Sequence, residues 1–266
     1  MAAKKMRIPS PIAVAGVLLA IALLLVFASV AGQLTKYWLG HDHVYGLVPL
    51  FYLDAERNIP TLFSVLLLLL SAILLFVVTT AKKQERDPDV SKWTILTCGF
   101  LLMAADEAFS FHEKLTSPVQ RLLGDGPLGV FYFAWVIPGS IVVVVLSIFF
   151  LRFLLRLPAT TRWTFIVAGI LYSGGVFGLE LLGGRYMELH GNQNLTYSMI
   201  ATVEESLEMA GVIVFIYALL NYVHAQRADR NRTPGCTMSA PHSGAVDRQA
   251  TFPADSHMGV KSDENN

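Results

Sequence analysis

Six apolar stretches, each long enough to cross a membrane as a helix, constrain this chain more than any other feature. They occupy residues 12–31, 61–79, 93–112, 130–151, 163–182 and 199–222. A hydrocarbon core of about 30 Å needs roughly 20 mainly apolar residues in a helix. Apolar residues make up 54% of the chain and charged residues only 15%, unlike an ordinary soluble domain. We therefore predict an all-α fold, a polytopic membrane helix bundle with six transmembrane helices over residues 1–224.

The remaining residues, 225–266, lack apolar runs and are rich in Ser, Thr, Pro, Asn, Asp and Arg, which predicts a disordered polar cytoplasmic tail. The first apolar run has a second interpretation, a cleaved signal peptide, since Lys4, Lys5 and Arg7 precede it and Ala31 ends a small-residue triplet. The run exceeds the usual signal core of about 7–15 residues, which favours an uncleaved helix.

The Lys and Arg residues predict the orientation. Cytoplasmic loops carry an excess of these residues. Thirteen lie on one side of the six spans and five on the other, which predicts an inner-membrane protein with both termini in the cytoplasm. The predicted partner is the lipid bilayer, with a homo-oligomer or a membrane partner subunit left open. Twenty Lys and Arg balance twenty Asp and Glu, so the charge gives no indication of a nucleic-acid partner.

Acidic residues gather near the predicted outer ends of three spans. An acid near the centre of a membrane helix costs about 2.5–3.5 kcal/mol, so these side chains should face the bundle interior. We expect them to converge in one site at the extracytoplasmic boundary. They are Asp106, Glu107, Glu113, Glu180, Glu204, Glu205 and Glu208.

A purely structural role is an alternative for some of these acids. Glu204 and Glu205 lie near a predicted helix N-terminus, where the helix dipole favours negative charge. Glu180 and Glu188 could form ion pairs with Arg185. The acids of span 93–112 lie instead at its C-terminal end, where the dipole disfavours them, and capping does not explain them.

Helical geometry predicts how the acids of span 93–112 are arranged. At about 100° per residue on a continuous helix, Glu107, Ser110 and Glu113 share a stripe with Asp106. His112 then lies roughly 100° outside that stripe unless the helix unwinds there. His112 is nevertheless the best nitrogen candidate beside the acids.

Crowded carboxylates must bind a metal ion, hold protons or border water. Oxygen-rich ligand sets suit Mg²⁺, Mn²⁺ or Ca²⁺, and iron stays open although the Glu-x-x-His pairs of di-iron bundles are absent. The exposed-loop residues His41, His43 and His190 are weaker ligand candidates. The candidate metal ligands are Asp106, Glu107, His112, Glu113, Glu180, Glu204, Glu205 and Glu208.

Several functions fit an outward-facing carboxylate-rich site that binds a divalent cation or protons. The alternatives are a membrane metal-dependent hydrolase, a small cation or proton transporter, and a non-catalytic membrane subunit or sensor. Whether the protein is an enzyme is left open. Few polar residues continue towards the cytoplasmic ends of the acidic spans, which gives a path through the membrane little support.

Two motifs carry a family resemblance. DEAFSFHE, from Asp106 to Glu113, and EESLEM, from Glu204 to Met209, resemble the DE-x-x-x-x-HE and EE-x-x-EM segments of an uncharacterised family of bacterial polytopic membrane proteins. That resemblance implies that the acids form one site, and it implies no reaction. Asp106, Ser110 and His112 are also faintly similar to the metal-site residues of alkaline-ceramidase-like hydrolases, but the late histidine pair of those enzymes is missing.

Overall fold

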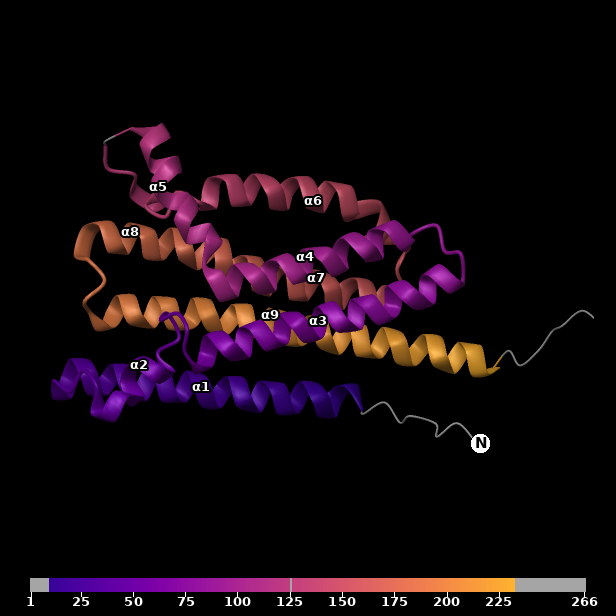
Figure 1. Ribbon diagram of the computed structural model, residues 1–266, viewed down its shortest axis with the longest axis horizontal. Helices are drawn as coiled ribbons and strands as arrows, with labels where there is room; N and C mark the ends of the chain where they lie inside the picture. Colours follow the sequence, from indigo (N-terminus) through magenta and orange to yellow (C-terminus); the bar gives the residue numbers. More distant parts are fainter. Residues whose placement is uncertain (1–9, 125, 233–266) are drawn as a thin grey trace, which may run out of the picture.

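The computed structural model describes residues 10–124 and 126–232, and all regular secondary structure in this part of the chain is helical (Figure 1). This confirms the all-α prediction. The helices are α1 (Pro11–Leu39), η1 (Val44–Gly46), α2 (Leu47–Phe51), α3 (Ile59–Gln84), α4 (Val90–Phe109), α5 (Phe111–Leu123), η2 (Gly129–Phe131), α6 (Val136–Arg156), α7 (Ala159–Ser173), η3 (Gly174–Leu179), α8 (Glu180–His190) and α9 (Leu195–Arg232).

Five helical segments are long and apolar enough to cross a membrane. They are α1, α3, α6, the continuous α7–η3–α8 segment and α9. Helices α4 and α5 together make a sixth, which is bent by 79° between them. Each of the six predicted spans therefore lies mainly within a helix or within such a bent pair.

The long segments run back and forth, so that two ends of the bundle can be distinguished (Figure 1). Helix α5, the connection from α1 to α3 and the connection from α8 to α9 lie at one end, on the left of the view. We call this the α5 end. The start of α1, the end of α9, and the α3–α4 and α6–α7 connections lie at the opposite end, which we call the α3–α4 end.

Helix α9 is the central element of the bundle. It packs against α1, α3 and α7, and its residues Met209, Ile216 and Leu219 are almost completely buried. Leu67 and Leu75 of α3 are equally buried in the two apolar clusters that α9 helps to form. The most apolar buried surface thus lies along the middle of α9.

Helix α6 lies at the edge of the bundle (Figure 1) and leaves much of its apolar surface uncovered. Its side chains Ile141, Val142, Val145 and Ile148 are all more than half exposed. Uncovered aliphatic side chains over the length of a helix are costly in water but not in lipid. This surface is what a lipid-facing helix requires.

Several boundaries differ from the predicted ones. Helix α6 begins at Val136 rather than residue 130, with Pro138 in its first turn, where a missing N–H is not needed. Helix α9 continues to Arg232 and so extends beyond the predicted domain end at residue 224. The rest of the predicted tail, and the Lys and Arg residues before α1, lie outside the described residues.

Candidate functional site

The chain breaks sharply at Ser110, between α4 and α5. Ser110 adopts a left-handed conformation (φ 50°, ψ 50°), and its N–H donates a hydrogen bond of 2.6 Å to the carbonyl oxygen of Asp106. Helix α5 then leaves at 79° to α4. The continuous helix that we expected through residue 112 is therefore wrong, and so is the single stripe from Asp106 to Glu113, because Glu113 belongs to α5.

The break returns His112 to Asp106. The backbone N–H of His112 donates to Asp106 Oδ1 (2.9 Å), and its Nδ1 lies 2.7 Å from Asp106 Oδ2. The expectation that His112 points away from the acids held only for an unbroken helix. Here the left-handed residue supplies the unwinding that brings the imidazole and the carboxylate together.

His112 connects this pair to the start of α6. Its ring lies 4.6 Å, centroid to centroid, from the indole of Trp135. The Nε1–H of Trp135 donates a 2.7 Å hydrogen bond to Glu180 Oε1, at the first residue of α8. Side chains from α4, α5, α6 and α8 thus form one continuous set of contacts.

Glu180 in turn meets the acids of α9. The carboxyl groups of Glu180 and Glu204 are hydrogen-bonded to each other. Helix η3, a π-helical turn with three glycines, allows this close approach. A Cβ atom at Gly175 would lie only 2.9 Å from the Glu204 carbonyl oxygen and 3.0 Å from Glu208 Cγ.

The remaining predicted acids lie in the same neighbourhood. Glu208 is close enough to Glu107, Glu180 and Asp106 for their charges to repel it. Glu205 is repelled by Glu208 and Glu107. The structure therefore places the eight predicted site residues in one neighbourhood. Together with Asp54 and Glu56, described next, we call them the carboxyl cluster.

Asp54 and Glu56, from the loop between α2 and α3, are functional candidates that the sequence analysis did not place in the site. The Tyr52 hydroxyl donates to Asp54 Oδ2 (2.9 Å) and lies 3.2 Å from Ser198 Oγ. Glu56 is hydrogen-bonded to Glu113 and to Ser110. Neither acid belongs to an apolar span, so helical periodicity does not indicate them.

The two loop acids, Asp54 and Glu56, have pKa values that are shifted in opposite directions. Surrounding protein atoms that exclude water, and the nearby charge of Glu180, raise the pKa of Asp54 to about 6 against the opposing hydrogen bond from Tyr52. Asp54 nevertheless retains surface exposure. The hydrogen bond from Ser110 lowers the pKa of Glu56. Asp54 therefore releases its proton at a higher pH than Glu56 does.

No Lys or Arg side chain in the described part of the chain forms an ion pair with a cluster acid, although the charge of Arg57 acts on Glu56. Among residues 10–124 and 126–232, the cluster's only ion pair is the one between Asp106 and His112. Of the two acids expected to pair with Arg185, Glu188 does so (2.8 Å), and Glu180 forms no ion pair within the described part of the chain. The Nζ of Lys114 donates to a backbone carbonyl, that of Phe109.

The cluster acids of α4, α8 and α9 are half-buried, whereas Glu113 of α5 is exposed. Within the described part of the chain, no group of three or more His, Cys, Asp or Glu side chains has an arrangement that could hold a metal ion. His41 and His43 are exposed, and the His190 ring stacks on Tyr186 at 4.5 Å. These three histidines lie apart from the contacts described above, and the metal site stays a prediction.

Comparisons with known proteins agree with the predicted kind of family. No curated protein and no solved structure matches the chain. A family model described as a domain of unknown function, DUF8692, matches residues 12–223. This range holds all six apolar stretches and both acidic motifs, and the chain therefore belongs to the DUF8692 family.

Proposed function

We propose that the protein is a multi-pass inner-membrane protein that stores protons in the carboxyl cluster at its extracytoplasmic face. Its five apolar helical segments, or six with the α4–α5 pair, have the length that a bilayer requires. Lys82, Lys83, Lys92 and Arg156 lie at or near the α3–α4 end, opposite the acids. By the positive-inside rule that end, with both termini, is cytoplasmic.

The hydrogen bond between Glu180 and Glu204 carries the proposal. Two ionised carboxylates are both acceptors, so a hydrogen bond between them requires one proton. Glu56 and Glu113 form a second such pair. Adjacent carboxyl groups that share one proton are known in acid–base sites, because like charges at contact cannot both stay ionised.

Access from one face only distinguishes this site from a conducting pore. Below Glu208, α9 continues with the buried apolar residues Met209, Val212, Ile213 and Ile216, packed against Leu67 of α3. Water and protons are poorly accommodated in such a layer. The protein then acts as a proton-responsive membrane subunit or sensor rather than as a channel.

A divalent cation is the second candidate occupant, because the described cluster residues form no ion pair with Lys or Arg, but the side chains would have to rearrange to hold it. A hard ion such as Mg²⁺, Mn²⁺ or Ca²⁺ would take oxygen ligands from these carboxylates. It would compensate the negative charges in place of the shared protons. Iron stays a weaker choice, because His112 supplies the cluster's single imidazole.

The test is a proton count on detergent-purified protein. During titration from strongly alkaline to neutral pH, where the shared proton binds, the Glu204→Gln variant should take up about one proton fewer than wild type. Asp42→Asn, which removes an exposed acid outside the cluster, is the matched control, and its proton uptake over this range should equal that of wild type. Equal uptake by wild type and Glu204→Gln contradicts proton storage.

Metal analysis separates the two occupants. A stoichiometric divalent metal that is lost in both Asp106→Asn and Glu208→Gln assigns the site to a cation instead of protons. Flux in liposomes tests the one-sided access. We expect no proton or cation flux above that of empty vesicles, and flux abolished by Glu208→Gln would assign transport.

A further inference from the structure

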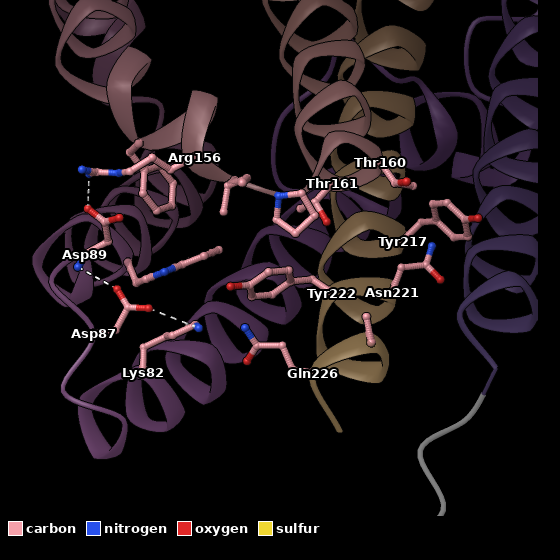
Figure 2. A pocket seen from close by; sticks show the side chains of 15 residues that line it. Lys82, Asp87, Asp89, Arg156, Thr160, Thr161, Tyr217, Asn221, Tyr222 and Gln226 are labelled. Carbon is pink, nitrogen blue, oxygen red and sulfur yellow. Dashed lines mark hydrogen bonds and ion pairs between the residues drawn. The ribbon is translucent and has the colours of Figure 1, made fainter. Parts of the chain in front are cut away.

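A second polar site lies at the α3–α4 end of the bundle, away from the carboxyl cluster. It is a cavity of about 650 Å³ between the end of α3, the start of α4, the α6–α7 connection and the last turns of α9 (Figure 2). This volume is in the range that binds small molecules and cofactors. The cavity has no part in the proton storage proposed above.

Fixed charges of both signs line the cavity. Lys82 Nζ lies 3.2 Å from Asp87 Oδ2, and the guanidinium of Arg156 forms an ion pair with Asp89 (Figure 2). Asp87 Oδ1 also accepts the backbone N–H of Asp89 at 2.8 Å, which holds the two carboxylates side by side. Two cations and two anions give the lining no net charge but a strong local separation of charge.

The charged groups have capacity left for a ligand. The Arg156 side chain is 58% exposed and uses one of its two terminal NH₂ groups on Asp89, so most of its five N–H donors are free. The side-chain amides of Asn221 and Gln226 also line the cavity, and they make no hydrogen bond within the described part of the chain (Figure 2). Polar groups of this kind fix the orientation of a bound molecule.

The inner wall of the cavity is aromatic and rigid. Trp93 and Phe153 line it and are almost fully buried, with their rings edge to face at 5.0 Å. Tyr222 stacks on Trp93 at 5.3 Å. A polar rim over an aromatic wall at the end of a membrane helix bundle is typical of the headgroup level of a bilayer.

From this arrangement we infer that the cavity binds a phosphate group joined to a primary amine, as in the headgroup of a phosphatidylethanolamine lipid. The phosphate takes the free donors of Arg156, and the ammonium lies against Asp87 and Asp89. A headgroup with a net negative charge has no ammonium group to place against Asp87 and Asp89, so its charge would be repelled by these carboxylates. The lining as a whole is neutral and would not attract such a headgroup. The lipid as source rests on the membrane assignment proposed above, whereas the headgroup chemistry does not.

Native mass spectrometry of the purified full-length protein tests the inference. Wild type should retain phosphatidylethanolamine at least fivefold over phosphatidylglycerol when both are offered at equal concentration. Asp89→Asn gives the lining a net positive charge, so the preference should fall to parity or reverse. Asn221→Leu should weaken retention of phosphatidylethanolamine without favouring phosphatidylglycerol.

The controls distinguish a loss of binding from a loss of folding, and they show whether the ligand is the lipid or the free headgroup compound. Arg152→Gln, an exposed charge near the same end of α6 outside the cavity lining, should leave the preference unchanged. Each variant is compared by thermal unfolding in the same detergent, and Asp87→Asn, which makes the same change in the charge of the lining, takes the place of Asp89→Asn if that variant unfolds. Soluble phosphoethanolamine, titrated into delipidated protein, identifies the free compound as the ligand if it binds as tightly as the lipid, and the lipid if it binds more weakly.

Equal retention of the two lipids by wild type overturns the inference, and so does a preference that survives Asp89→Asn or Asp87→Asn in a folded variant. Either result would leave the proton storage untouched, because the two sites share no residue. Conversely, failure of the proton count at Glu204 leaves the lipid preference standing.

Discussion

The imidazole Nδ1 of His112 lies 2.7 Å from Asp106 Oδ2, on the far side of a helix break. Asp106 also accepts the backbone N–H of His112, so one carboxylate binds both the main chain and the side chain of the same residue. This double contact fixes the direction in which α5 leaves α4. The helix break and the acidic site are therefore parts of one structure.

The left-handed residue at the break should be sensitive to the bulk of its side chain. An L-residue in this conformation costs roughly 1–2 kcal/mol, and a β-branched residue costs more. Ser110→Val should lower the free energy of unfolding by about 2 kcal/mol, because it adds strain and removes the hydrogen bond to Glu56. Ser110→Gly relieves the strain and should stay within about 1 kcal/mol of wild type. Reversible unfolding in mixed micelles measures both, and equal losses in the two variants would argue against strain at the break.

The pKa of Asp54 predicts a pH dependence of stability. Its folded-state pKa is raised from 3.8 to about 6, so the folded protein holds this proton at pH values where the unfolded chain has lost it. The associated stabilisation is fully present below 3.8 and is lost as the pH rises to about 6. As the pH rises from 3.8 to about 6, the stability of Asp54→Asn should therefore fall less than that of wild type. Melting temperatures of both proteins across the window check this, and parallel curves would show that Asp54 titrates normally.

Close contact between η3 and α9 predicts opposite effects for two neighbouring glycines. Gly175→Ala forces a Cβ to within 2.9 Å of the Glu204 carbonyl oxygen and should cost about 1–3 kcal/mol. A Cβ at Gly178 meets nothing within 4 Å. Gly178→Ala should be neutral or stabilise the helix by up to about 1 kcal/mol. Unfolding free energies of the pair decide the point, since similar values would mean that η3 and α9 are not in contact.

The indole of Trp135 should stabilise Glu180. Its Nε1–H donates at 2.7 Å, and hydrogen bonds to charged groups contribute about 1.5–3 kcal/mol. Trp135→Phe should destabilise the protein by an amount that shrinks when Glu180→Leu is already present, with a coupling of about 1 kcal/mol or more. Trp163→Phe, at an exposed position near the opposite end, should change stability by less than about 0.5 kcal/mol. A double-mutant cycle with no coupling would mean that the indole and the carboxylate do not interact.

The helices were predictable from the sequence because apolar runs of membrane length leave few alternatives. The run over residues 199–222 is helical throughout, as predicted, and its acids share a site with Glu180. The break at Ser110 was not predictable, because FSFHE contains neither Gly nor Pro. Only the tertiary contacts of Asp106 and Glu56 compensate its strain.

Asp54, Glu56 and Trp135 belong to the site but could not be predicted from the sequence, and the physical reason is common to them. Asp54 and Glu56 lie in a loop, where neither periodicity nor apolar surroundings indicate that an acid faces inward. Trp135 lies in an apolar stretch, where its position in the sequence predicts only an aromatic residue at the membrane–water interface. Only the fold places its N–H against Glu180. The sequence thus predicted the acids on the helices and not the groups that bind them.

The most direct test of proton storage is infrared difference spectroscopy of the carbonyl stretch of protonated carboxylic acids, recorded at neutral pH in H₂O and D₂O. Wild type should show a band that shifts on deuteration, Glu204→Gln should lose part of it, and Asp42→Asn should retain it in full. A wild-type spectrum at neutral pH without such a band would mean that Glu180 and Glu204 share no proton, which would contradict the account.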